Sequence, residues 1–300
     1  MNGKPQTKAT SAYLFAGVAI VFWSTISTAF KLSLQNQSPS QLLLWASAVS
    51  TLVIFIVILL QKKTGLLLQG SRWDLVHSAI LGFLNPFLYY MVLLEAYNRL
   101  PAQEAQVLNY IWAVMLSLLA IPILKQIPRF RDISGVLISF CGAVMIALRG
   151  DFRQLHFAEP LGVGLALIST LIWALFWLYN VKDKRDEVVK LFWIFVFGLL
   201  FILIFTAVTK QFSLPNKWAL AGAVYVGIFE MGITFIVWLM ALQRAASTAR
   251  VTNLIFITPF ISLLLINRVL GEQILQSTFI GLVLIIGGIL WQQTGKRLNS

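Results

Sequence analysis

The sequence is poor in charged residues, cysteine and histidine. Only 11% of its 300 residues are charged, whereas 59% are hydrophobic. A soluble domain of this length would need far more polar surface, so the composition predicts an all-α polytopic membrane protein. The single cysteine, Cys141, excludes a disulfide framework and a zinc cluster. The two histidines, His77 and His156, form no ligand spacing, and we expect neither a metal nor a cofactor.

Acidic residues are scarcer than basic ones, 11 against 23, which gives a net charge of +12. In a soluble protein this balance would favour a nucleic-acid partner. In a membrane protein it is better explained by lysines and arginines that anchor cytoplasmic loops, so we expect a lipid bilayer around the chain and no nucleic acid. Residues 1–11 lack a small-residue cleavage site and are interpreted as a cytoplasmic tail rather than a signal peptide.

Apolar windows of about 17 to 25 residues suffice to cross a bilayer as helices. Ten such windows occupy residues 12–32, 41–61, 75–97, 102–124, 132–149, 161–181, 190–209, 218–242, 247–268 and 276–293. With the N-terminus inside, only seven of the 23 basic residues fall on the outer side: Lys31, Arg99, Arg149, Arg153, Lys210, Lys217 and Arg268. The remaining 16 lie in cytoplasmic segments, which predicts that both termini are cytoplasmic.

One stretch of the chain occurs twice, about 145 residues apart. The matched pairs are Asn85 with Glu230, Ala96 with Ala241, Arg99 with Arg244, Asn109 with Asn253, Gly135 with Gly281 and Gly142 with Gly288. Five windows precede the second copy, so it enters the membrane from the opposite side. Two inverted five-helix repeats are the architecture of a secondary transporter, with the substrate site near the midplane between the halves.

The second copy carries a recognisable set of motifs: Leu242-Gln243-Arg244-Ala245, Asn253, Thr258-Pro259, Leu270-Gly271-Glu272, Gly281 and Gly288. On these residues it resembles the EamA repeat of the drug/metabolite transporter superfamily. The first copy resembles it more weakly, through Phe22-Trp23-Ser24 and Leu100-Pro101-Ala102. The first copy has Gln126-Ile127-Pro128 in place of the Gly-Glu pair, and Trp45 stands where a basic residue is often seen, which weakens any clamp for an anionic substrate.

This resemblance spans nearly the whole chain. It implies ten helices, inverted symmetry, cytoplasmic termini and a central cavity that opens alternately to either side of a bacterial cytoplasmic (inner) membrane. Relatives move amino acids, other small metabolites, nucleotide sugars or sugar phosphates, and the bacterial ones are often exporters. The predicted organisation is a tail at 1–11, a first repeat at 12–149, a connecting loop at 150–160, a second repeat at 161–293 and a tail at 294–300.

Glu230 lies near the middle of the window 218–242. A carboxylate there costs roughly 2.5–3.5 kcal/mol to insert, so we expect it to face a cavity and to bind a substrate ammonium group or a coupling proton. The alternative is a structural hydrogen bond between helices. Gly227 and Thr234 share its helical face and would give it room and a polar neighbour.

Asn85 occupies the matching position and precedes Pro86, which removes an intrahelical hydrogen bond. We expect Asn85 and Tyr89, one turn later, to line the ligand site, and the alternative is a kink that serves packing alone. Asn109 and Asn253 form the second pair. They either line the site or join helices by hydrogen bonds.

Two further stripes follow helical spacing: Ser24, Thr28 and Lys31 in the first window, and Trp173, Trp177 and Asn180 in the sixth. Trp23, Trp112 and Trp173 lie far enough inside their windows to form cavity walls, although core or lipid packing is the alternative. Aromatic walls suit apolar or ammonium-bearing cargo.

Acidic residues flank the turn Arg99-Leu100-Pro101 on the predicted outer side. Glu95 and Glu104 could form an ion-pair gate with Arg99 or Lys31, or could belong to a solvated turn with an acid at the helix N-terminus, and we favour the second interpretation. Glu272 is expected to cap or pack the connection between the last two windows.

The leading hypothesis is a secondary active transporter that works by alternating access as a monomer, exports amino acids or related metabolites, and has a proton as its candidate coupling partner. The alternative is an uncoupled facilitator or channel, for which the sequence shows no charge ring or filter motif. We do not expect an enzyme, because the windows hold no histidine pair or aspartate pair.

Overall fold

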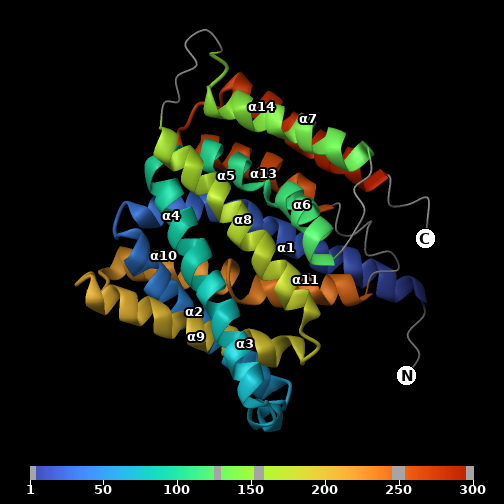
Figure 1. Ribbon diagram of the computed structural model, residues 1–300. Coiled ribbons are helices and arrows are strands. Elements are labelled where there is room, and N and C mark those ends of the chain that lie inside the picture. The colour runs from blue at the N-terminus through green and yellow to red at the C-terminus, as the bar shows by residue number, and fades with distance from the viewer. Residues whose placement is uncertain (1–4, 125–129, 152–158, 245–253, 295–300) are drawn as a thin grey trace. The chain divides into compact units, whose positions relative to one another are not determined.

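The computed structural model describes residues 5–124, 130–151, 159–244 and 254–294, and every regular element in these ranges is a helix (Figure 1). The chain groups into two compact units. Unit 1 comprises Met1–Gly82 and Arg185–Gly271, and unit 2 comprises Phe83–Lys184 and Glu272–Ser300. Each unit therefore draws elements from both predicted repeats.

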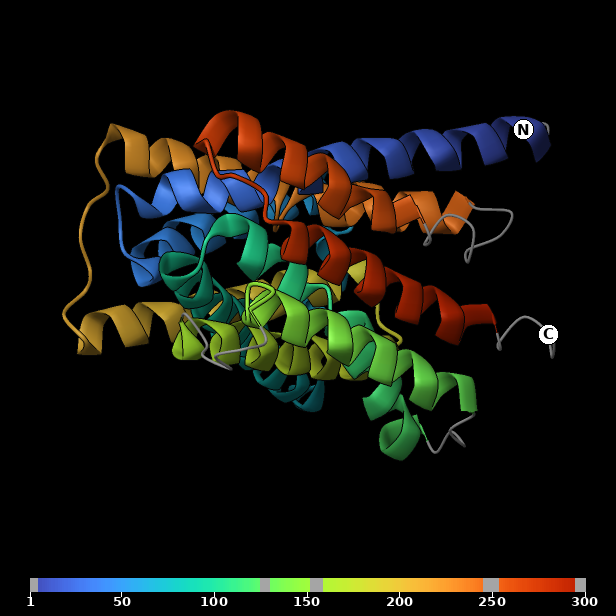
Figure 2. The same ribbon diagram turned by 90° about the horizontal axis from the view of Figure 1, so that it is seen from above.

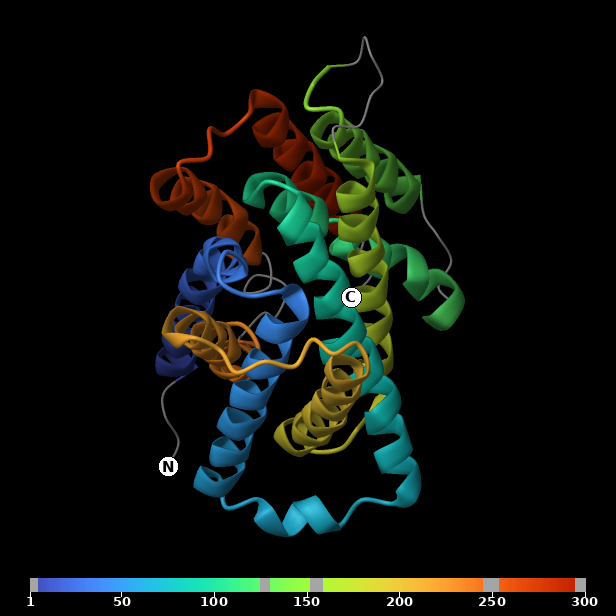
Figure 3. The same cartoon turned by 90° about the vertical axis from the view of Figure 1, so that its left-hand side faces the viewer.

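The described residues of unit 1 form ten helical elements. They are α1 (Pro5–Leu34), α2 (Pro39–Leu60), η1 (Thr64–Leu68), α3 (Arg72–Gly82), α9 (Glu187–Val208), α10 (Lys217–Phe229), α11 (Ile233–Arg244), η3 (Leu254–Ile257), α13 (Thr258–Leu265) and η4 (Ile266–Leu270). Helix α1 packs against α10, α11 and α13, while α9 packs against α2 and α3. Figure 3 shows the short η1 bridging the ends of α2 and α3, with α9 between them.

Side chains cap the helices of unit 1 and fix where they begin. Ser38 and Gln41 form a reciprocal capping box at the start of α2, and Asn216 accepts two backbone N–H bonds at the start of α10. Asp186 does the same for α9 and also accepts a hydrogen bond from Lys63 Nζ at 2.6 Å. Partial burial alone would raise the pKa of Asp186, but the Lys63 bond and charge and the two backbone N–H groups together hold it below its usual range.

In the described part of unit 2 there are seven helical elements. They are η2 (Phe83–Leu88), α4 (Tyr89–Arg99), α5 (Ala102–Asn109), α6 (Trp112–Leu124), α7 (Phe130–Ala147), α8 (Pro160–Lys182) and α14 (Gln276–Thr294). Helix α8 packs against η2, α4, α5 and α6, so it is the central element of this unit. Helices α7 and α14 lie side by side (Figures 1 and 2).

The four glycines that recur between the predicted repeats form the contact between α7 and α14. A Cβ atom on Gly142 would lie 2.6 Å from the carbonyl oxygen of Gly281, and one on Gly288 would lie 2.5 Å from that of Gly135. The absence of side chains lets the two backbones approach closely, which is how membrane helices associate without a hydrophobic driving force.

The prediction of a polytopic membrane protein is confirmed. Six helical segments are long and apolar enough to cross a membrane: Ser11–Leu34, Pro39–Leu60, Arg72–Arg99, Pro160–Asn180, Glu187–Val208 and Lys217–Trp238. Three shorter apolar helical segments, Ile133–Ala147, Leu254–Leu270 and Gln276–Trp291, fall in three further predicted windows. The remaining window, 102–124, is divided between α5 and α6.

Among the described residues, four of the ten windows are not one uninterrupted α-helix. The window 75–97 is interrupted by the π-helical η2, which contains Pro86, and the window 102–124 is interrupted at residues 110–111. The window 218–242 is interrupted at residues 230–232, and the described part of the window 247–268 divides into η3, α13 and η4. Such breaks free backbone groups inside a membrane, and these groups need partners within the protein or in a cavity.

Candidate substrate site

The helix breaks coincide with the polar residues that the sequence carries twice. Asn85 is the residue of η2 whose backbone leaves the helical region, with φ −150° and ψ 124°. Asn109 is the last residue of α5, and Glu230 follows the last residue of α10. Asn253 lies outside the described residues. The predicted polar positions therefore lie at helix ends rather than in helix interiors.

In unit 2 the breaks bring together three of the predicted site residues. The Tyr89 hydroxyl donates to Asn109 Oδ1 at 3.4 Å, and the Tyr89 and Trp173 ring centroids are 4.5 Å apart. Trp177 continues the aromatic surface, with its ring centroid 5.8 Å from that of Trp173. Tyr89 thus links Asn109 to the aromatic surface of Trp173 and Trp177.

Ser169 completes this cluster and was missed by the sequence reasoning. The Asn109 Nδ2 amide donates to Ser169 Oγ at 3.0 Å, and Ser169 in turn donates to the carbonyl of Ala166 at 2.7 Å. Ser169 precedes Trp173 by one helical turn in α8, so extending the stripe of Trp173 and Trp177 backward would have found it. We call Tyr89, Asn109, Ser169 and Trp173 the unit 2 cluster.

Asn85 and Gln106 are buried amides of unit 2 with polar atoms that make no hydrogen bond within the described part of the chain. Asn85 is 0% exposed, and neither its Nδ2 nor its Oδ1 has a partner there. Gln106, one turn before the cluster residue Asn109, has an unpartnered Oε1. An unsatisfied buried polar group costs about 1–3 kcal/mol, so these amides are suited to interact with a polar ligand.

In unit 1, Glu230 lies at the junction of α10 and α11. It is half-buried, and its backbone N–H donates to the carbonyl of Val226 at 2.9 Å. The expectation that Gly227 gives Glu230 room is wrong, because Gly227 packs closely on α2, where a Cβ atom would lie 2.6 Å from the carbonyl oxygen of Ala46. The Thr234 hydroxyl donates to the carbonyl of Phe229, so it satisfies a backbone group at the break.

The first predicted stripe of unit 1 has mixed roles. Ser24 is buried and donates to the carbonyls of Ile20 at 2.6 Å and Thr258 at 3.3 Å, so it joins α1 to α13. Lys31 and Trp23 are half-buried. The Trp23 ring packs against two aromatic rings of α11, those of Phe235 and Trp238, at centroid distances of 6.1 and 5.5 Å.

Thr28, the middle residue of that stripe, lines a cavity of about 470 Å³ between α1, α10 and η4. The cavity is mainly apolar, and its polar contacts come from Thr25, Thr28, Ser33 and Tyr225 among others. Thr25 donates to the carbonyl of Phe22 at 2.6 Å, so the Tyr225 hydroxyl, 2.7 Å away, must be the donor to Thr25. The Tyr225 oxygen can then still accept a hydrogen bond from a ligand in the cavity.

Three further residues of unit 2 that the sequence analysis singled out are Trp112, Asn180 and Arg99. Trp112 is half-buried at the start of α6, and Asn180 is buried near the end of α8. Arg99 pairs with Glu95 at 2.8 Å and with Glu159 at 3.7 Å.

Glu104 lies in the first turn of α5, as the favoured interpretation of the outer turn has it, but its surroundings differ from that interpretation. It is only 2% exposed rather than solvated, and its partner is Arg149, which donates through Nε at 2.7 Å and through Nη2 at 3.4 Å. Glu272 does act as a cap, as expected, but for α5. Its carboxylate accepts the backbone N–H groups of Ala102 at 2.9 Å and Gln103 at 3.2 Å.

Within the described ranges, no three His, Cys, Asp or Glu side chains are close enough to hold a metal ion. The candidate site chemistry is therefore that of hydroxyls, amides and aromatic rings in unit 2, and of Glu230 in unit 1. These groups can bind a small organic molecule without an inorganic cofactor.

Comparison with known proteins finds relatives along nearly the whole chain. The chain is 23% identical over 286 residues to an uncharacterized transporter of Archaeoglobus fulgidus, covering 93% of this chain and 96% of that protein. It is 26% identical over 305 residues to an uncharacterized transporter of Clostridium kluyveri, covering 96% and 95%. It is 23% identical over 302 residues to the uncharacterized transporter YvbV of Bacillus subtilis, covering 98% and 95%.

A protein of known crystal structure matches the fold over 97% of this chain and 100% of that one, with a TM-score of 0.65 and 22% sequence identity. The EamA-like transporter family matches residues 10–148 and again residues 160–292. Together these ranges include almost the entire sequence. The chain belongs to the EamA-like transporter family, within the drug/metabolite transporter superfamily.

Proposed function

We propose that the protein is a secondary active transporter that moves small organic metabolites by alternating access. The observation that carries this proposal is the placement of Asn85, Asn109 and Glu230 at interruptions of apolar helices. In secondary transporters, discontinuous helices supply both polar side chains and free backbone groups to the substrate and to the coupling ion. Packing alone gives no reason to keep such breaks at depths where each unsatisfied group is costly.

The architecture we propose is ten helices in two inverted five-helix repeats with cytoplasmic termini. Two separate matches to the family, at 10–148 and 160–292, support a duplicated chain. The pairing of Asn85 with Glu230 supports it as well, because both lie at a break in the corresponding window. We place the protein in the bacterial cytoplasmic membrane as a functional monomer.

The cargo we propose is an amino acid or a related compound, moved outward. An amino acid carries an ammonium group, a carboxylate and a side chain of variable polarity. The unit 2 cluster offers Tyr89 and Trp173 as aromatic surfaces and Asn109 as an amide that can donate and accept. Glu230 is the proposed partner for the ammonium group or for a coupling proton.

The second candidate function is an uncoupled facilitator for the same class of metabolite. Among the four described residues of the unit 2 cluster, Tyr89 is the only one with an ionisable side chain, and this favours a facilitator. A neutral binding cluster needs no exchange of protons to take up or release cargo. The distinction therefore depends on Glu230.

Reconstitution in proteoliposomes tests the proposal. Vesicles preloaded with unlabelled amino acids, amines or sugar phosphates are assayed for counterflow of the labelled compound, and then for accumulation under an imposed pH gradient. We expect counterflow with amino acids and accumulation only when the gradient is present. Equal downhill flux with and without a gradient would establish the facilitator, and flux of sugar phosphates alone would refute the proposed cargo.

A further inference from the structure

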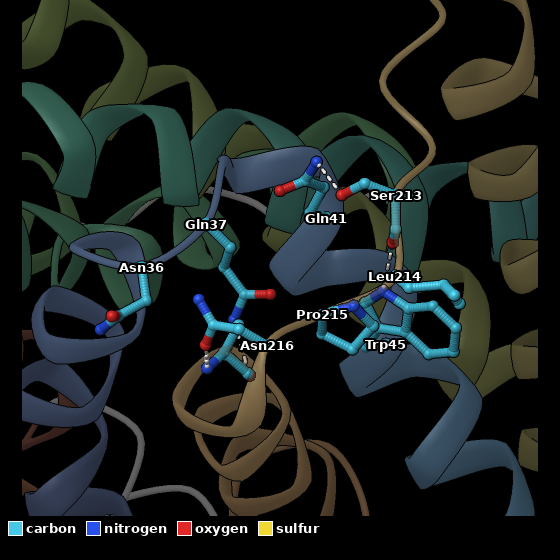
Figure 4. Close-up of a pocket in the computed structure, with 9 residues that line it drawn as sticks. Asn36, Gln37, Gln41, Trp45, Ser213, Leu214, Pro215 and Asn216 are labelled. Carbon is cyan, nitrogen blue, oxygen red and sulfur yellow. Dashed lines mark hydrogen bonds between the residues drawn. The ribbon is translucent and has the colours of Figure 1, made fainter.

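A second cavity of unit 1, of about 210 Å³, lies where the α1–α2 connection meets the segment that joins α9 to α10 (Figure 4). It is lined by Asn36, Gln37, Gln41, Trp45, Ser213, Leu214, Pro215, Asn216 and Ala219. The predicted topology puts both connections on the outer side of the membrane. The helix breaks of the proposed transport function contribute no residue to this cavity, so it is a separate site, which we call the amide pocket.

Hydrogen bonds hold one wall of the amide pocket in place. Gln41 Nε2 donates to Ser213 Oγ at 2.6 Å and to the carbonyl of Gln211 at 3.1 Å, while its Oε1 accepts from the backbone N–H of Ser38 at 3.3 Å. The Trp45 indole N–H donates to the carbonyl of Ser213 at 3.3 Å. The connection before α10 is thereby anchored on α2, and the pocket is pre-formed.

Three amides that line the other side keep hydrogen-bonding capacity. Gln37 Nε2 donates to the carbonyl of Ala219 at 2.9 Å, which leaves its Oε1 buried without a partner among the described residues. Asn216 Oδ1 accepts the N–H groups of Trp218 and Ala219, so its Nδ2 faces outward as a donor. Asn36 Nδ2 donates to the carbonyl of Leu32 at 3.2 Å, which leaves its Oδ1 as an acceptor.

The composition of this lining selects a class of ligand. No charged side chain is among the lining residues, so a charged molecule would lose hydration without gaining a counter-charge. Acceptors from Gln37 and Asn36 beside a donor from Asn216 match hydroxyl groups, because a hydroxyl both donates and accepts. Trp45, Leu214 and Pro215 offer apolar surface on the opposite side in Figure 4.

The size of the pocket limits the ligand further. Sites for drug-sized molecules measure about 300–1,000 Å³, and the amide pocket is smaller. We propose that the amide pocket binds a neutral polyhydroxylated solute of monosaccharide size, with its hydroxyls on Gln37 and Asn216 and its apolar face on Trp45. This inference does not depend on the identity of the transported cargo.

Binding is measured by isothermal titration calorimetry on the full chain in lipid nanodiscs, which avoids detergents with sugar headgroups. The ligands are D-glucose and D-xylose, with glucose 6-phosphate and L-alanine as charged comparators. We expect saturable binding of a neutral sugar and affinities at least about tenfold weaker for the charged compounds. No saturable binding of either neutral sugar, or equally tight binding of L-alanine, would overturn the proposal.

Asn216→Asp is the informative variant, because aspartate is as good an N-cap as asparagine and should keep α10 intact. It replaces the outward donor with a charged acceptor, so sugar affinity should fall about tenfold or more. Asn98→Asp makes the same chemical change at an exposed position of α4 and should leave affinity unchanged. Unchanged binding in Asn216→Asp would place the ligand elsewhere. Because no flux is measured, either result leaves the transport proposal to its own test.

Discussion

Removing Arg149 should destabilise the protein far more than removing another ion-paired arginine of the same unit. Arg149 donates two hydrogen bonds to Glu104, whose side chain is 3% exposed, while the Arg149 side chain is 40% exposed. Arg149→Met keeps much of the apolar stem and leaves the buried carboxylate without its cation. Arg149 has a positive φ of 51°, but methionine also carries a Cβ atom, so the substitution leaves the backbone strain unchanged.

The expected magnitude follows from the burial of the two partners. Breaking a fully buried pair costs about 3–5 kcal/mol, and a hydrogen bond to a charged group is worth about 1.5–3 kcal/mol. Because Arg149 is partly solvated, we expect a loss of about 2–3 kcal/mol in the free energy of unfolding. At about 2–4 °C per kcal/mol, the Tm should fall by roughly 4–12 °C.

The assay is thermal unfolding in lipid nanodiscs followed by circular dichroism, on four proteins in a double-mutant cycle. Glu104→Gln/Arg149→Met should be more stable than Arg149→Met by about 1–2 kcal/mol, because the double variant no longer buries an unpaired charge. Arg99→Met is the matched control. Its pair with Glu95 has side-chain exposures of 38% and 32% and should contribute less than about 1 kcal/mol. A double variant no more stable than Arg149→Met would refute the reasoning.

Three further predictions concern packing, capping and the unit 2 cluster. Gly288→Ala should lower the free energy of unfolding by about 1–3 kcal/mol, because its Cβ would meet the Gly135 carbonyl of α7. Gly287→Ala is the control in the same unfolding assay, and it should be neutral or stabilising because the space at its Cβ is open. Asp186→Asn should be less stable than the natural chain at pH 7. Because the pKa of Asp186 is lower in the folded than in the unfolded state, the ionised carboxylate stabilises the fold above the unfolded-state pKa, and this stabilisation is lost as the pH falls through the folded-state pKa. The Tm difference between the natural chain and Asp186→Asn should therefore shrink below about pH 4. A difference that grows there would contradict the prediction. Ser169→Ala removes the acceptor of the Asn109 amide and should cost about 0.6–1.7 kcal/mol, and an unchanged Tm would show that this bond contributes nothing measurable.

The sequence was informative where the signal is local and periodic. Apolar length alone located the six long helical segments, because burial in lipid requires it. Pro86 predicted the interruption at η2, because proline has no backbone N–H to donate to the helical hydrogen-bond pattern. Tyr89, Asn109 and Trp173 were each named as candidates because they are polar or aromatic at membrane depth, whereas their mutual contacts came from the structure.

The remaining features depend on tertiary contacts that no local pattern encodes. The break after Glu230 contains no proline, and it is accommodated because the Thr234 hydroxyl donates to the carbonyl of Phe229. The partner of Glu104 lies 45 residues away, so its burial against Arg149 was not foreseen, and a solvated turn was expected instead. The recurrent glycines were evident as a repeat, whereas their mutual packing between α7 and α14 required the structure.

Transport by the Glu230→Gln variant is the most direct test of the claim that Glu230, at the break between α10 and α11, couples transport to protons. The natural chain and the variant are reconstituted at equal density, and amino-acid accumulation is recorded as the imposed pH gradient is varied. We expect accumulation to follow the gradient in the natural chain, and the variant to retain counterflow while losing its dependence on the gradient. If Glu230→Gln accumulates amino acids with the same gradient dependence as the natural chain, Glu230 has a structural role and the proposed coupling site is wrong.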